Sequence, residues 1–422
     1  MKNLFKRGTL LLGAAMFSSA IIISCNDEEQ SLNQPTQKPE TKEAVETTVD
    51  GHGDIIPGSY IVTLKQDAAG TNMRTMKGYA TRQAVAKPVM SDMITRAGLQ
   101  SDQLKNVYSA EGMLGFSVDN VNNDDLEKLK SMPNVESVTP NRVIALIPWY
   151  CALFPWLPDC DEDPEPNPDQ TTPWGITRVG GATDFSNSSK KAFIIDTGID
   201  LDHPDLNVNT SLSRSFVTGS PDDGNGHGTH VAGTIGAIDN GIGVVGVAAG
   251  VQVVAVQVLN ASGSGSYAGV ISGIDYVAQT GNTGDVANLS LGGPADNSID
   301  NAIKALGNAG VYVSLAAGNE SQNANNTSPA RVNGSRIFTV SSMTSSDALS
   351  YFSNYGNPPV DFAAPGSDIA STWKNGGYNT ISGTSMAAPH VAGLLLVTNG
   401  NIQSDGYVSG DRDSNPDPIA HK

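Results

Sequence analysis

The stretch Gly383–Gly393, which reads Gly-Thr-Ser-Met-Ala-Ala-Pro-His-Val-Ala-Gly, places a serine among small residues directly before an apolar run. The run continues through Leu394–Val397 and predicts a buried helix that begins at the serine. A serine in the first turn of a helix has a free backbone N–H and lies at the positive end of the helix dipole. Ser385 is therefore placed as a nucleophile whose attack creates an oxyanion, although a plain N-cap role also explains the stretch.

Two upstream stretches carry the side chains that such a nucleophile needs. Ala192–Ile195 is a short apolar run typical of a buried strand, and it ends at Asp196 in an Asp-Thr-Gly motif. A carboxylate in that position lies at the rim of a sheet, where open α/β sheets form their clefts. His227 opens the motif His-Gly-Thr-His, and a helix of small residues follows it. The three side chains form a triad only if they converge in space, and each alone is also explained as a structural residue.

The second half of the chain alternates between strand and helix patterns. Apolar runs predict buried strands over 252–259, 286–290 and 311–315, and helical spacing predicts helices over 271–277 and 299–306. This alternation predicts an α/β fold, a parallel sheet with helices on both faces. The net charge of −18 argues against a nucleic-acid partner, because phosphate binding requires a basic surface.

In chain order, the motifs at Asp196, His227 and Ser385 resemble the catalytic motifs of the subtilisin family of serine proteases. The resemblance extends over residues 170–400 and includes three further segments, His203–Leu206, Ser290–Gly293 and Ala316–Asn319. It implies a subtilisin-like α/β fold and a serine endopeptidase that hydrolyses protein or peptide substrates through an acyl-enzyme.

The resemblance also implies a role for each matching side chain. Ser385 attacks the scissile carbonyl, His227 accepts its proton, and Asp196 orients the ring of His227. The side-chain amide of Asn319 and the backbone N–H of Ser385 hold the oxyanion. The second histidine of the motif, His230, is expected to pack structurally.

Substrate-binding edges and a calcium site follow from the resemblance alone. Substrate is expected to lie as an added strand between Ser264-Gly265 and Leu291-Gly292, which implies broad specificity. The loop 238–244 has the length of the family's high-affinity calcium loop, although a simple Asn-Gly turn also explains it. The implied Ca²⁺ ligands are side-chain oxygens of Gln170, Asp205 and Asn240 and carbonyls of Ile238, Ile242 and Val244.

Residues 1–24 combine basic residues with an apolar run from Leu10 to Ile23, which is typical of a signal peptide. The end of the run resembles a bacterial lipoprotein box with Cys25 as the acylated residue, and an ordinary secretory signal is the alternative. Residues 25–57 lack a hydrophobic period and predict a flexible tether. These features place the protein in the cell envelope, including the outer surface, or in the secreted fraction after processing.

Residues 58–147 predict a ferredoxin-like unit with the order β-α-β-β-α-β, including a helix near 91–97. Ahead of a subtilisin-like domain, this unit is similar to the family's propeptide, an intramolecular chaperone and inhibitor. The acidic, proline-rich residues 148–169 are the expected processing linker, in which Cys151 and Cys160 are close enough for a disulfide. The catalytic domain spans 170–422, and its Gly-, Asp- and Pro-rich end, 399–422, is expected to wrap as loops or to bind an ion.

The sequence thus predicts a monomeric zymogen that is inhibited by its own propeptide and held at a membrane by lipid on Cys25. The alternative from another class is a noncatalytic surface-binding lipoprotein on a subtilisin scaffold. A third reading is a serine protease of a different clan with Ser-Glu-Asp chemistry. His227 in its motif argues against the third, and the complete set of Asp196, His227, Ser385 and Asn319 argues against the second.

Overall fold

The computed structural model describes residues 51–68, 76–146, 168–217 and 219–422. Within these ranges an N-terminal domain (51–146) precedes a C-terminal domain (168–422). The predictions for the signal segment, Cys25, Cys151, Cys160 and the linker fall outside the described residues. No helix in the described ranges is both long and apolar enough to span a membrane.

The N-terminal domain has the predicted β-α-β-β-α-β order and an antiparallel sheet with strand order β4-β1-β3-β2. Its elements are β1 (Ile55–Leu64), α1 (Tyr79–Arg96), the 3₁₀ helix η2 (Ser101–Gln103), β2 (Leu104–Tyr108), β3 (Gly115–Val118), α2 (Asn123–Ser131) and β4 (Val135–Ala145). Apolar residues of the sheet, such as Val62 and Phe116, pack against Ile94 of α1 and Leu129 of α2. Strand β1 begins three residues before the boundary predicted at 58, and α1 extends well before Ser91, with Pro88 inside the helix.

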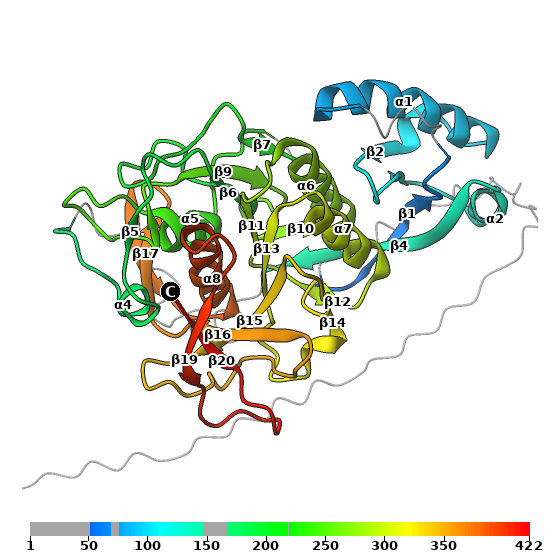
Figure 1. The fold of residues 1–422 in the computed structure, drawn as a ribbon. Coiled ribbons are helices and arrows are strands. Elements are labelled where there is room, and N and C mark those ends of the chain that lie inside the picture. Colours follow the sequence, from blue (N-terminus) through cyan, green and yellow to red (C-terminus); the bar gives the residue numbers. More distant parts are fainter. Residues whose placement is uncertain (1–50, 69–75, 147–167, 218) are drawn as a thin grey trace, which may run out of the picture. The chain divides into compact units, whose positions relative to one another are not determined.

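The C-terminal domain is built on a nine-stranded sheet with the order β19-β20-β16-β15-β13-β11-β6-β9-β7 (Figure 1). Its strands are β6 (Lys191–Asp196), β7 (Arg214–Ser215), β9 (Gln252–Gln257), β11 (Val286–Leu289), β13 (Tyr312–Ala316), β15 (Ile337–Met343), β16 (Val360–Pro365), β19 (Gln403–Tyr407) and β20 (Pro418–His421). All neighbouring strands are parallel except β19 and β20.

Helices cover both faces of this sheet because its strands alternate two sets of apolar side chains. Phe193 and Ile195 of β6 face the helices α6 (Tyr267–Thr280) and α7 (Asn297–Asn308). Ala192 and Ile194 face α5 (His227–Gly236) and α8 (Thr384–Val397). The predicted α/β architecture is therefore confirmed, with α5 and α8 lying together on one face (Figure 1).

Short elements complete the C-terminal domain. They are α4 (Trp174–Arg178), η4 (Ala324–Asn326), and the strand pairs β5 (Thr183–Asp184) with β8 (Ala248–Ala249), β12 (Gly293–Pro294) with β14 (Thr327–Ser328), and β17 (Ile369–Trp373) with β18 (Gly377–Ile381). The strand pairs form small sheets that are separate from the nine-stranded sheet.

The chain from 399 to 422 differs from the loop expected there, because it adds strands β19 and β20 to the sheet (Figure 1). Val408 and Ile419 pack on Met343 and Leu349, so few but well-spaced apolar residues anchor the segment. A short strand with two buried apolar positions is easily hidden in a sequence rich in Gly, Asp and Pro.

The two domains contact each other through a shared sheet edge and a helix. Strand β10 (Ser264–Ser266) of the C-terminal domain pairs antiparallel with the end of β4, with Gly265 opposite Ile144. In α6, the buried carboxylate of Asp275 accepts the backbone N–H groups of Ser109 and Ala110, both at 2.7 Å. Burial raises the pKa of Asp275 to about 7, against the effect of these hydrogen bonds.

Candidate active site

Asp196 and His227 form a hydrogen-bonded pair at the carboxyl end of the sheet. Oδ1 of Asp196, the last residue of β6, is 2.8 Å from Nδ1 of His227, the first residue of α5. The Asp196 side chain is fully buried, whereas 13% of the His227 side chain is exposed. This arrangement fixes the ring and leaves Nε2 of His227 on the side away from the carboxylate.

Close backbone approach brings α5 to the end of β6. A Cβ atom at Gly228 would collide with the carbonyl oxygen of Gly198, so only glycine fits after His227. The carboxylate of Asp223 accepts the N–H groups of Gly226 and Thr229, each at 2.9 Å, and thus caps the first turn of α5. The turn that presents His227 is therefore held from two sides.

The histidines of the domain differ in their electrostatics. Burial opposes a charge on His227, but the nearby Asp196 carboxylate outweighs burial and raises its pKa above the usual 6.5. Burial lowers the pKa of His230 to about 3 and that of His390 to about 4. Nε2 of His230 is 2.9 Å from the carbonyl oxygen of Ile369, as befits a neutral, structural histidine.

Ser385 is the second residue of α8, as the opening motif predicts. Its hydroxyl donates a hydrogen bond of 3.2 Å to the carbonyl of Ser290, and the hydroxyl of Ser290 donates one of 2.7 Å to the carbonyl of Ser385. Within the described residues there is no hydrogen bond between Ser385 and His227. A hydroxyl is a free rotor, and catalytic hydrogen bonds commonly tighten only when substrate is bound.

Thr384 orients the side chain of Asn319. Its Oδ1 accepts both the N–H and the O–H of Thr384, each at 2.9 Å, so its Nδ2 is directed away from these donors. A Cβ atom placed on Gly383 would lie 3.6 Å from Nδ2 of Asn319 and 3.7 Å from the backbone nitrogen of Ser385. Two N–H donors thus lie close to one point beside the serine.

The predicted substrate edges lie in different surroundings. Ser264 and Gly265 form part of β10 and are occupied by β4 of the N-terminal domain. Leu291 is buried, and Gly292 adjoins β12. In the described part of the chain, neither Leu291 nor Gly292 is paired with β4.

The loop 238–244 brings several of the predicted calcium ligands together. Oδ2 of Asp205 accepts the N–H of Val244 at 3.1 Å, whereas its buried Oδ1 has no partner in the described residues. Oε1 of Gln170 accepts the N–H groups of Asn240 and Gly241. The carbonyl groups expected as ligands belong to Ile238, Ile242 and Val244, and Oδ1 of Asn240 accepts the N–H of Ile242 at 3.0 Å.

This donor set is oxygen-rich but has few charges. In the ranges that the structure describes, no three His, Cys, Asp or Glu side chains converge as metal ligands. A cation at the loop would depend on Asp205 together with amide and carbonyl oxygens, a set that fits a hard ion such as Ca²⁺.

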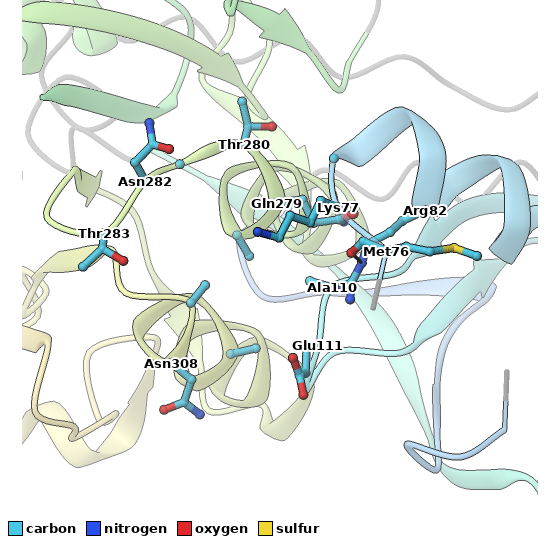
Figure 2. A pocket seen from close by; sticks show the side chains of 15 residues that line it. Met76, Lys77, Arg82, Ala110, Glu111, Gln279, Thr280, Asn282, Thr283 and Asn308 are labelled. Atoms are coloured by element: carbon cyan, nitrogen blue, oxygen red, sulfur yellow. Dashed lines mark hydrogen bonds between the residues drawn. The ribbon is translucent and has the colours of Figure 1, made fainter. Parts of the chain in front are cut away.

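A cavity of about 520 Å³, whose lining is drawn in Figure 2, is lined by neither Asp196 nor His227. Residues of the N-terminal domain, such as Lys77 and Glu111, face residues at the ends of α6 and α7, such as Gln279 and Asn308, across it. The cavity belongs to the junction between the domains, because residues of both domains line it.

Some residues that build the site carry no strong signal in the sequence. Asp223 precedes an Asn-Gly turn and reads as an ordinary loop residue, and Thr384 reads only as part of the serine motif. Asp223 positions α5 and Thr384 positions Asn319 through hydrogen bonds. For Asp223, the signal in the sequence is a carboxylate four residues before the start of α5.

The parallel sheet, the Asp196–His227 pair and the helix-borne Ser385 together define a subtilisin-like serine peptidase. Comparison with known proteins gives the same result. The profile of the subtilase family matches residues 192–404, and that of the peptidase inhibitor I9 family matches residues 59–146. The chain therefore belongs to the subtilase family of serine endopeptidases and carries an I9 propeptide domain, the prodomain, ahead of the peptidase domain.

Individual relatives agree with this assignment. Alkaline serine exoprotease A of Vibrio alginolyticus is 37% identical over 400 residues, which is 92% of this chain and 68% of that protein. The cuticle-degrading protease of Metarhizium anisopliae is 44% identical over 236 residues, 53% of this chain and 59% of its own length. The crystal structure of a cold-adapted subtilisin-like serine proteinase is 41% identical and superposes with a TM-score of 0.52, covering 59% of this chain and 97% of its own.

Proposed function

We propose that this protein cleaves peptide bonds with an Asp196-His227-Ser385 triad. In the attack, Ser385 Oγ bonds to the scissile carbonyl carbon as its proton passes to Nε2 of His227. The imidazolium is stabilised by the Asp196 carboxylate, which keeps its negative charge. His227 then gives the proton to the leaving amine, and water hydrolyses the acyl-enzyme by the same route in reverse.

The oxyanion is assigned to Nδ2 of Asn319 and the backbone N–H of Ser385. The observation that carries the proposal is the convergence of these two donors beside Gly383, with Asn319 held by Thr384. A noncatalytic binding protein on this scaffold has no chemical need for such an arrangement. Donors of this kind are fixed before the reaction and are most effective in the transition state.

A fluorophosphonate probe tests the proposal, because it labels only a serine whose hydroxyl is activated. We expect the processed enzyme to be labelled at Ser385, with Ser385→Ala unlabelled and His227→Ala labelled far more slowly. If folded protein whose active site is open to the probe is not labelled, the noncatalytic alternative is favoured.

Broad specificity is part of the proposal. The strand β4 lies on β10 as an added strand, and pairing of this kind reads the backbone of a peptide more than its side chains. We propose that substrates take the place of β4 at Ser264 and Gly265, with Leu291 and Gly292 on the other edge. The prodomain is accordingly an inhibitor that fills the cleft until it leaves.

We propose a structural Ca²⁺ ion at the loop 238–244. The unpartnered Oδ1 of buried Asp205 supports it, since an isolated carboxylate oxygen in the interior is costly without a cation or a proton. When bound, the ion would link Gln170, near the start of the peptidase domain, to Asp205 and Asn240. It takes no part in the chemical step.

Processing and location complete the proposal. The domain limits are 1–24 for the signal, 25–57 for the tether, 58–147 for the prodomain, 148–169 for the linker and 170–422 for the peptidase domain. With lipid on Cys25, the precursor is membrane-bound, and a cut within 148–170 releases a monomeric protease unless a Cys151–Cys160 disulfide or the docked prodomain retains it. Membrane fractionation with N-terminal sequencing of the soluble form tests this order, and an active enzyme that is still acylated contradicts it.

A further inference from the structure

The residues just before β1 contact the end of β4, although they lie outside the predicted prodomain. The N-terminal clamp, defined here as Gly51–Asp54, forms a turn in which the N–H of Asp54 donates to the carbonyl of Gly51 at 3.0 Å. We define the inhibitory strand as Arg142–Leu146, the end of β4 with the residue that follows. The clamp and the inhibitory strand run side by side.

The inhibitory strand is hydrogen-bonded along both of its edges. On one edge, Ile144 lies opposite Gly265 of β10, and the N–H of Leu146 donates to the carbonyl of Gly263 at 2.8 Å. On the other edge, the N–H of Val143 donates to the carbonyl of Asp54 at 2.9 Å. Successive backbone amides of a strand point to opposite sides. The amide of Leu146 therefore faces the segment of β10, and the amide of Val143 faces the clamp.

His52 completes the second edge with a side-chain atom. Its Nδ1 accepts the N–H of Ala145 at 3.1 Å, two residues beyond Val143. The N–H of Gly53 donates to the carbonyl of Val143 at 2.9 Å, and Arg142 donates from its guanidinium to the carbonyl of Gly53 at 2.8 Å. The clamp thereby satisfies the amides of Val143 and Ala145, on the edge of the inhibitory strand that does not pair with β10.

Gly53 also seats the clamp on the peptidase domain. Its φ of +84° lies in the left-handed region, and a Cβ atom there would be 2.7 Å from Cγ of Pro294, the last residue of β12. β12 directly follows Leu291 and Gly292, the edge on which we propose that substrates pair. The clamp therefore contacts both the inhibitory strand and β12, the strand that follows Leu291 and Gly292.

We propose that Gly51–Asp54 is a second inhibitory element of the prodomain, which holds the inhibitory strand in the cleft by its outer edge, with His52 as a positioning residue. The inference rests on the proposed function, in which that strand blocks the substrate cleft. It assigns inhibition to residues outside the I9 match at 59–146 and within the segment taken as tether. The partner of the clamp is the backbone edge of an extended strand, the same feature that the protease recognises in its substrates.

Hydrogen–deuterium exchange of the full-length Ser385→Ala chain, resolved to single amides, tests the clamp without requiring activity. In His52→Ala, we expect the Ala145 amide to exchange about tenfold faster, the change that follows the loss of one hydrogen bond of ordinary net strength. Leu146, on the β10 edge, should keep its rate. His52→Asn should restore Ala145, because an amide oxygen can accept in place of Nδ1.

Gly53→Ala and Gly78→Ala form a matched pair. Both glycines have nearly the same positive φ, +84° and +86°, but a Cβ atom at Gly78 has no neighbour within 4 Å. Both variants therefore place a side chain at a similar positive φ, and only Gly53→Ala pushes the clamp off Pro294. We expect faster exchange at Val143 and Ala145 in Gly53→Ala and unchanged exchange at these amides in Gly78→Ala.

A second measurement follows activation in chains that retain Ser385. His52→Ala and Gly53→Ala should shorten the lag before the purified precursor hydrolyses a peptide substrate, and Gly78→Ala should not. Equal exchange at Val143 and Ala145 in all variants would overturn the clamp. Absence of hydrolysis in every chain would instead count against the proposed protease function, while the exchange result stands by itself.

Discussion

Asn319→Ala should separate transition-state stabilisation from substrate binding. The substitution removes Nδ2, one of the two donors that lie near Gly383, and we expect kcat to fall about 100- to 1000-fold, about 3–4 kcal/mol, with little change in KM. The same substitution removes the acceptor of two Thr384 hydrogen bonds of 2.9 Å. Part of the loss therefore reports on positioning, and part on the missing donor.

Thr384→Val separates the two parts. Valine keeps the shape of threonine and its backbone N–H but lacks the hydroxyl that donates to Oδ1 of Asn319. The hydroxyl also accepts the N–H of Gly318 at 3.1 Å, so the substitution removes two neutral hydrogen bonds. Loss of the one to Asn319 should cost about tenfold in kcat. In the Asn319→Ala background the same change should cost less, because only the hydrogen bond from Gly318 is left to lose.

The assay is steady-state hydrolysis of a peptide p-nitroanilide by the processed enzyme and its three variants, with circular dichroism to verify folding. Two results would refute the reasoning. The first is an Asn319→Ala effect confined to KM. The second is a Thr384→Val effect of equal size with and without Asn319.

Three other predictions follow from the electrostatics. The pKa of His227 is raised above 6.5, so kcat/KM should fall as the pH drops through that higher value. Asp196→Asn should move this acid limb of the pH profile to lower pH, and a limb that does not move contradicts the assigned pair. Burial raises the pKa of Asp275 to about 7 when the prodomain is docked. The affinity of the cleaved prodomain should therefore fall as the pH rises from about 4 towards 7, by up to about tenfold per pH unit. Native mass spectrometry should find this pH dependence lost in Asp275→Asn. Chelation of Ca²⁺ should lower the melting temperature of the processed enzyme by several degrees, and Asp205→Asn should abolish this effect of the chelator. If calorimetry shows no shift in the unmodified enzyme, the loop 238–244 is a turn that binds no ion.

The parts of the molecule that the sequence predicts are those with a local pattern. Strand β6 is a continuous apolar run that ends at Asp196, and α8 begins within one residue of Ser385, as expected. The β-α-β-β-α-β order of the prodomain also follows from local periodicity. Each of these features is set by neighbours in the sequence, and so it can be predicted from them.

The parts that escaped prediction depend on contacts between distant residues. The clamp Gly51–Asp54 has no hydrophobic period, and it is ordered by hydrogen bonds to residues about ninety positions away, such as that between His52 and Ala145. The strands β19 and β20 are held by packing of Val408 and Ile419 on Leu349 and Met343. Composition alone assigns both segments to loops, because the partners that order them are absent from the local sequence.

Asp275 is a buried carboxylate at the contact between the prodomain and the peptidase domain. In α6 it lies next to Ile274, on the helix that the sequence predicts over 271–277. In the structure it is fully buried and accepts the backbone N–H groups of Ser109 and Ala110, which are 166 and 165 positions away. The side-chain N–H groups of Gln83 and Gln279 donate to it as well. Ser109, Ala110 and Gln83 belong to the prodomain, which leaves under the processing that we propose, whereas Gln279 lies in α6 and remains. Docking must desolvate this group each time, and the N–H donors of the prodomain compensate for that cost only while the prodomain stays in place.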